Sequence, residues 1–212
     1  YPMNEGDVVS NRGLHIPVSR FEEEFHEVQV PHSNALHCVR NGGGSYLVGA
    51  MARYALNRDR LGPRARAMIA EVGLEPVVRN PFRSVVVRAV EMVQACDEAL
   101  RIIDRYHEPD RSWDESEGPF TSANCAAITE APRGLLYHRY RLNASGLIEE
   151  ARIIPPTSQN QKRIEDDVRD VVNQSSDLDE ARLTNECERA IRNHDPCISC
   201  ATHFLTLDLV RS

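Results

Sequence analysis

The sequence lacks any run of the roughly 20 apolar residues that a membrane-spanning helix needs, so no transmembrane segment is expected. Residues 1–5 (YPMNE) have neither the basic nor the apolar region of a secretion signal. Basic side chains are too few for a general nucleic-acid binder, because 25 Lys and Arg stand against 32 Asp and Glu, a net charge of −7. We therefore expect a cytoplasmic protein without a nucleic-acid partner.

The remaining composition is ordinary for a folded protein. Of the 212 residues, 41% are hydrophobic and 27% are charged, which is enough to build a sizeable core. There are no internal repeats or low-complexity tracts. The first residue is Tyr1 rather than Met, which indicates that a preceding segment has been removed or that the chain is one half of a larger unit.

The apolar pattern predicts a single α+β domain that is mainly helical, with long core helices and a β-hairpin. Residues 1–50 are expected to form short strands with a turn at 41–44. The predicted helices cover residues 59–73, 82–107, 157–173 and 179–192, the predicted hairpin strands cover 135–142 and 147–154, and 108–134 are predicted to be loop.

Two of these helices carry more detailed expectations. In the longest, apolar residues from Val86 to Ile103 predict a helix that lies in the core along its length. Thr157 or Ser158 is expected to cap the next helix, after Pro155-Pro156 ends the second hairpin strand. In the last helix, the residues expected to point inward are Ala181, Cys187 and Ile191.

Only two of the six cysteines are close in sequence. The other four are expected to be small buried hydrophobic side chains rather than members of disulfides: Cys38, Cys96, Cys125 and Cys187. Cys197 and Cys200 belong to the run DPCISCATH at 195–203. Because Asp is a preferred helix N-cap and Pro a preferred first residue, a short helix is expected to begin there. Spacing by three then places Cys197, Cys200 and His203 on one face.

The chemistry open to this face is metal binding or redox exchange. A thiol in the first helical turn tends to ionise, and two converging thiolates form a soft-metal site or a redox pair. Zinc and iron–sulfur sites need four ligands, and the sequence has a single C-x-x-C pair. A bound metal would therefore take its other ligands from the scattered cysteines or from another polypeptide. The alternative is a dithiol or a pair of inert core cysteines.

Three further stretches stand out: SYLVG at 45–49 with Arg53 and Asn57 beyond it, EAPRGLLYH at 130–138, and ARIIPPTSQNQ at 151–161. Together with 195–203, they resemble the C-terminal half of the large, catalytic subunit of nickel–iron hydrogenases, in the expected order and over nearly the whole chain. The residues of these motifs are most similar to those of the cytosolic multisubunit types. The resemblance implies that fold for residues 1–203, and reversible oxidation of H2 to protons and electrons.

The resemblance also implies a set of metal ligands. Cys200 would bridge nickel and an iron that carries CO and CN ligands, and Cys197 would be a terminal nickel ligand. His203 would be the last residue of the mature chain and a ligand of a nearby magnesium or other divalent ion. Residues 204–212 would be an extension that a dedicated maturation endopeptidase removes.

Other residues would surround the metals. Arg133, next to Pro132, would reach over the site toward the iron's ligands, and Asp195 would hold its guanidinium in place. Glu130 would be a supporting carboxylate. Pro156 stands where many family members have a Ser or Thr that bonds a cyanide, so neighbouring Thr157 would take that part.

The chain departs from the family in lacking the R-x-C-x-x-C signature of the first cysteine pair. The implied partners are an N-terminal large-subunit half with that motif, an iron–sulfur small subunit, and diaphorase or other electron-carrier subunits. A second hypothesis is a metal-free, non-catalytic assembly module of a hydrogenase-like or respiratory complex. A zinc or dithiol protein is a more distant third.

Overall fold

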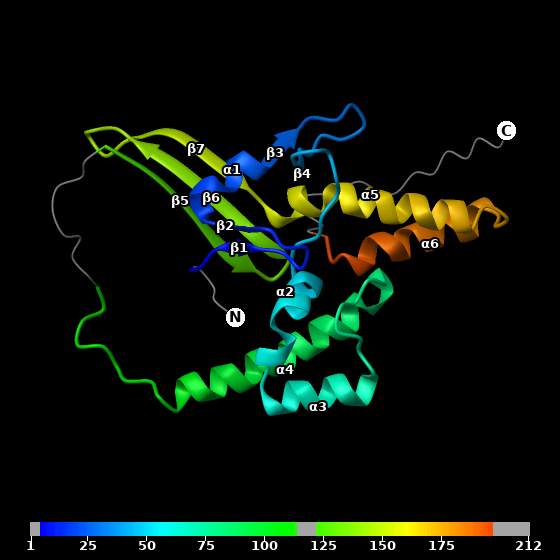
Figure 1. Ribbon diagram of the computed structural model, residues 1–212, viewed down its shortest axis with the longest axis horizontal. Helices are drawn as coiled ribbons and strands as arrows, with labels where there is room; N and C mark the ends of the chain where they lie inside the picture. The colour runs from blue at the N-terminus through cyan, green and yellow to red at the C-terminus, as the bar shows by residue number, and fades with distance from the viewer. Residues whose placement is uncertain (1–4, 114–121, 197–212) are drawn as a thin grey trace.

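The computed structural model describes residues 5–113 and 122–196, which form six α-helices and three antiparallel sheets (Figure 1). The strands are β1 (Val8–Val9), β2 (His15–Ile16), β3 (Phe25–Val28), β4 (His37–Arg40), β5 (Ala123–Ala131), β6 (Gly134–Leu142) and β7 (Ile148–Ile154). The helices are α1 (Phe21–Glu24), α2 (Ala50–Asn57), α3 (Pro63–Val72), α4 (Ser84–Ile103), α5 (Pro156–Gln174) and α6 (Glu180–Asn193), with 3-10 turns at Val18–Arg20, Arg58–Arg60 and Pro81–Arg83. The α+β fold that was predicted, mainly helical with a hairpin, is confirmed.

The largest sheet has the strand order β5-β6-β7, so the predicted hairpin is confirmed as β6 and β7. The prediction of loop over 108–134 is wrong for β5, which pairs with β6 from Ala123 opposite Leu142 to Ala131 opposite Gly134. The sequence of β5, ANCAAITEA, does not alternate large apolar and polar residues. Its strand structure comes from backbone pairing with β6, which single-strand patterning does not detect.

Two clusters of buried residues form the core. One joins α2, α3 and α4 through Met51, Tyr54, Leu61, Ala65, Ile69, Leu74, Val78, Val87 and Val90. The other packs the N-terminal strands and α1 against the sheet through Val8, Ile16, Phe21, Phe25, Cys38, Tyr137 and Ile154. In the second cluster the ring of Phe21 stacks on Phe25 and on Tyr137, with centroids 4.7 and 4.5 Å apart. The layers seen in Figure 1, sheet above and α2–α4 below, thus have separate cores.

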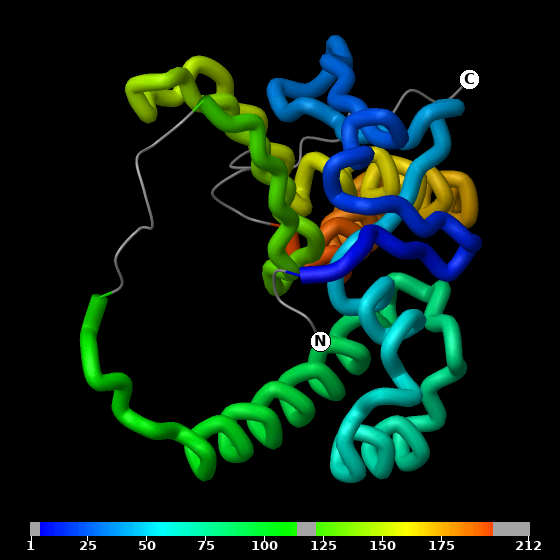
Figure 2. The backbone as a smooth tube through the Cα atoms, turned by 60° about the vertical axis from the view of Figure 1, so that its left-hand side comes forward, coloured from blue at the N-terminus to red at the C-terminus, as the bar shows by residue number. Residues whose placement is uncertain are grey.

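Helix α4 was predicted to lie in the core throughout, and this is wrong for its second half. Val87 and Val90 are fully buried, whereas Leu100 and Ile103 are 56% and 68% exposed. Figure 2 shows the C-terminal half of α4 extending away from the rest of the described chain. The apolar face continues past the last element that packs on it, so periodicity predicted the helix correctly and its burial incorrectly.

Other helix details also differ from prediction. The N-cap of α5 is Pro155 with Pro156 as the first helical residue, while the Ser158 hydroxyl donates to the Leu36 carbonyl at 2.8 Å instead of capping the helix. Asp179 caps α6 by accepting from the Arg182 amide. The inward face of α6 is formed by Leu183, Cys187 and Ala190, whereas Ala181 is exposed.

The four separate cysteines do not share one environment. Cys38 and Cys187 are buried as predicted, but Cys96 and Cys125 are exposed, because Cys96 lies on the outer side of α4 and Cys125 at an exposed position of β5.

Within residues 5–113 and 122–196, no helix is both long and apolar enough to cross a membrane.

Candidate functional site

Two of the stretches singled out in the sequence meet through glycines. Gly49, at the end of SYLVG, has φ +102°, and a Cβ added there would lie 2.6 Å from the carbonyl oxygen of Arg133. Gly134, with φ +134°, faces the side chain of Val48 so closely that a Cβ would overlap it. Any larger residue would push the two segments apart. The glycines therefore set how closely the start of α2 approaches the turn between β5 and β6.

Asn160, from the third stretch, links these two segments. The Val48 amide donates to Asn160 Oδ1 at 2.8 Å, and Asn160 Nδ2 donates to the carbonyls of Val48 and Arg133, each at 3.3 Å. The side chain is only 5% exposed. Sequence reasoning did not assign Asn160 a role, although it lies within the TSQNQ run. Its amide fixes α5 against both stretches, together with the neighbouring Gln159, which accepts from the Tyr46 hydroxyl and donates to the Leu135 carbonyl.

The turn that carries Arg133 is anchored from beneath by Arg53. The Arg53 guanidinium donates twice to Glu91 and once to Glu130, all at 2.8 Å, and once each to the carbonyls of Ala131 and Pro132 at 2.9 Å. Arg53 is 8% exposed. These bonds hold residues 130–132 to α2 and α4 and so determine where the next residue, Arg133, begins.

This network has unequal charges, one guanidinium against two carboxylates. Burial by itself would lower the pKa of Arg53, but the bonds and charges of Glu91 and Glu130 outweigh it and raise the pKa. Burial raises the pKa of Glu130, helped by the negative charge of Glu91 and opposed by Arg53. Glu130 is thus engaged with Arg53, in the layer beneath Arg133.

Arg133 itself lies against Asp195, the residue that precedes Pro196 and Cys197. Its Nε donates to the Asp195 carbonyl at 2.5 Å and lies 3.4 Å from Asp195 Oδ2. The two side chains are 39% and 45% exposed. The guanidinium thus contacts both a carbonyl and a carboxylate of a residue that lies 62 positions away in the sequence.

The segment before Asp195 is held on two sides. The carbonyl of Asn193 accepts from the Ser84 hydroxyl at 2.5 Å and from Arg88 at 3.0 Å. His194 Nε2 lies 2.8 Å from Asp167 Oδ2, and these two side chains are only 4% and 6% exposed. Asp195 then turns with φ +49°. The chain is therefore directed to a defined point just before Cys197.

A pocket lies between these parts, lined by Leu47, Val48, Ala50, Met51, Arg88, Pro132, Arg133, Asn160, Asn193, His194 and Asp195. Pro156 and Thr157 are not among its walls. Pro156 is buried and Thr157 half-buried at the start of α5, so their predicted place beside the iron ligands stays a prediction. The predicted ligands Cys197, Cys200 and His203, and the short helix expected to carry them, lie outside the described residues.

The sequence pattern of the nickel-dependent hydrogenase family matches residues 48–203. The chain belongs to this family. It is 30% identical over 205 residues to sulfhydrogenase 1 subunit alpha of Pyrococcus furiosus, which is 95% of this chain and 47% of that protein. It is 32% identical over 127 residues to the NAD-reducing hydrogenase HoxS subunit beta of Cupriavidus necator, which is 56% of this chain and 25% of that protein.

Among solved structures, the crystal structure of an NAD+-reducing nickel–iron hydrogenase in the H2-reduced state matches with a TM-score of 0.74 and 25% identity. The match covers 96% of this chain and 48% of that one. The chain thus spans about half the length of the sulfhydrogenase subunit and of the solved hydrogenase chain, and the predicted fold, half of a hydrogenase large subunit, is confirmed.

Proposed function

We propose that this chain is the C-terminal half of a nickel–iron hydrogenase catalytic subunit, which oxidises H2 reversibly to protons and electrons. The observation that carries the proposal is the Arg133–Asp195 pair, which lies on the wall of the pocket where the chain runs on to Cys197. Family membership supplies the nickel dependence, and the chain retains the thiols of Cys197 and Cys200.

The residues fit the group that the family binds. Cys197 and Cys200 would supply two of the thiolate ligands of a nickel–iron centre, since soft thiolates suit both metals. When bound, the centre would supply the cleavage of H2 into protons and electrons. CO and CN on the iron, and a magnesium or similar ion at His203, belong to the same proposal.

The chain's own part in catalysis would be positioning and electrostatics. Arg133 would present an always-charged donor to the metal centre's outer ligands, because its guanidinium cannot deprotonate. Asp195 would keep that guanidinium in one orientation, as a carboxylate beside a functional cation commonly does. Arg53 would hold the turn from below through its bonds to the carbonyls of Ala131 and Pro132.

The remaining parts of the enzyme would come from other polypeptides. An N-terminal half with the R-x-C-x-x-C motif would provide the other two thiolates, and a small subunit with iron–sulfur clusters would take the electrons. Diaphorase or other carrier subunits would follow, in a cytoplasmic complex. A maturation endopeptidase would remove residues 204–212 after His203. The relatives are themselves named as subunits of larger hydrogenases, which supports this arrangement.

The test is H2-dependent reduction of a viologen dye by the chain purified with its natural partner subunits. We expect Cys197→Ala to abolish activity, and Arg133→Lys to lower kcat by about 10²–10³-fold, the usual loss for one preorganised donor. Arg141→Lys is the matched control, because Arg141 is 53% exposed and lies on β6, the strand that follows Arg133. An Arg133 variant as active as this control would refute the role of Arg133. A complex that is intact but inactive with the unaltered chain would favour the assembly module.

A further inference from the structure

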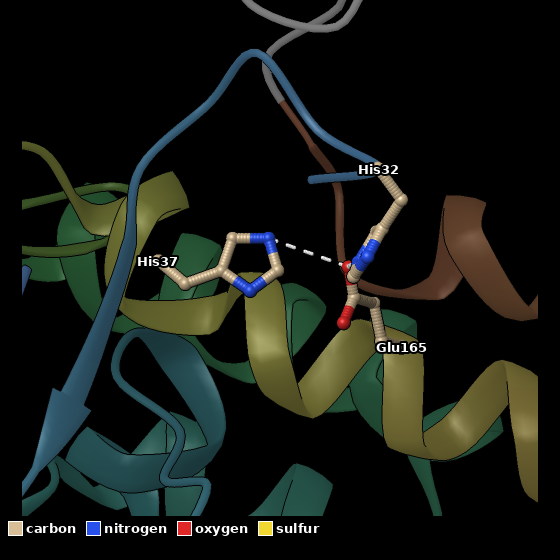
Figure 3. A group of neighbouring side chains, drawn as sticks. All are labelled: His32, His37 and Glu165. Carbon is tan, nitrogen blue, oxygen red and sulfur yellow. Dashed lines mark hydrogen bonds and ion pairs between the residues drawn. The ribbon is translucent and has the colours of Figure 1, made fainter. Parts of the chain in front are cut away.

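A second group of metal-ligating side chains lies outside the pocket of Arg133. His32 comes from the segment that joins β3 to β4, His37 is the first residue of β4, and Glu165 comes from α5 (Figure 3). Glu165 Oε1 lies 2.9 Å from His32 Nε2 and 3.3 Å from His37 Nε2. The three donor atoms all lie within 4.8 Å of one another. Residues 133 positions apart in the sequence thus converge on one point.

His37 is the residue that this arrangement leaves unexplained by protein contacts alone. It is 2% exposed, and its Nε2 has no hydrogen-bond partner within residues 5–113 and 122–196, although Glu165 is near. A buried nitrogen without a partner costs about 1–3 kcal/mol, so native proteins rarely leave one.

The separation of His37 from Glu165 agrees with two donors around one ion, whereas His32 and Glu165, 2.9 Å apart, are in direct hydrogen-bond contact. With bonds of about 2.0–2.1 Å, two ligands of a tetrahedral zinc ion are about 3.3 Å apart. The distance from His37 to Glu165 is 3.3 Å. Ligands of a shared ion point at the ion and not at each other, which accounts for a short contact between His37 and Glu165 without hydrogen-bond geometry. His32, whose side chain is 64% exposed, has room to complete the set.

We propose that His32, His37 and Glu165 bind a divalent transition-metal ion, represented here by Zn2+, with water in the fourth position. Imidazole nitrogens favour zinc, nickel and similar ions, whereas Mg2+ and Ca2+ prefer oxygen ligands throughout. The ion fastens the β3–β4 connection to α5. The site uses only residues of this chain.

The test is Zn2+ binding by the full chain carrying Cys197→Ser and Cys200→Ser, which removes the paired thiols. Competition with a chelating indicator should show one tight site that is weakened at least about tenfold by Glu165→Gln or His32→Ala, a loss no smaller than that caused by altering groups behind a metal ligand. The control is His15→Ala, since His15 pairs with Asp7 on an exposed hairpin and should leave affinity unchanged. Mg2+ should not compete.

Two further measurements keep the result decisive. Co2+ in place of Zn2+ should give visible absorption without a thiolate charge-transfer band, which excludes the remaining cysteines as ligands. His37→Ala removes a buried side chain, so its affinity is informative only if circular dichroism shows native folding. The main test therefore uses His32→Ala, because His32 is exposed. The proposal would be overturned if both His32→Ala and Glu165→Gln bound Zn2+ with unchanged affinity. A thiolate charge-transfer band, or the absence of any tight Zn2+ site, would also overturn it.

Discussion

Replacing Arg53 with Met should be among the most destabilising single changes in the described chain. Met keeps a long apolar stem but removes every bond to the two carboxylates and two carbonyls. Glu91 and Glu130, whose side chains are only 16% and 23% exposed, then lose their cation. Stranding a buried charge in this way costs about 3–5 kcal/mol. For a chain of this length that corresponds to a fall in Tm of about 6–20 °C.

The assay is thermal unfolding of the chain followed by circular dichroism at constant pH and salt. Arg64→Met is the matched control, because Arg64 pairs with Asp97 but is 74% exposed, and it should cost no more than about 1 kcal/mol. Adding Glu91→Gln and Glu130→Gln to Arg53→Met should recover part of the loss, since the stranded charges are removed. If Arg53→Met unfolds at the same temperature as Arg64→Met, the anchoring argument is wrong.

The remaining predictions concern backbone fit and thiol reactivity. Gly49→Ala should cost about 2–6 kcal/mol in denaturant unfolding, because strain at positive φ adds to the clash with the facing carbonyl. Gly42→Ala, also at positive φ but with open space around it, should cost about 1–3 kcal/mol, and equal costs would refute the close approach. In iodoacetamide at pH 8, Cys96 and Cys125 should react quickly by mass spectrometry. Cys38 should not, because burial removes access and raises its pKa to about 11; equal labelling would contradict its burial.

Periodicity predicted the elements that carry their own signal. The hairpin of β6 and β7 and the helices α4, α5 and α6 follow from apolar spacing and turn residues, within a few positions. Strand β5 has no such signal, because backbone hydrogen bonds to the neighbouring strand β6 stabilise it. The exposure of the second half of α4 could not be predicted either, since burial depends on what packs against the helix and not on the helix itself.

At the candidate site too, contacts that depend on the tertiary fold could not be predicted from local sequence patterns. The contact between Arg133 and Asp195 was expected only through the family resemblance, because no local pattern relates residues 62 positions apart. Arg53 lay in a stretch noted for that resemblance, but its bonds to two acids and two carbonyls depend on the tertiary fold. The cluster at Glu165 gave no sequence signal at all, since its two histidines and its acid lie in separate elements.

The central claim is that Cys197 and Cys200 hold half of a nickel–iron centre whose other half comes from a partner. The most direct test is elemental analysis of the chain purified within its natural complex. We expect nickel in the intact complex, with iron in excess of nickel because the clusters of the small subunit also contain iron, and loss of nickel on Cys200→Ser while the complex stays assembled. An intact complex without nickel, or one whose nickel is unaffected by Cys200→Ser, would contradict it.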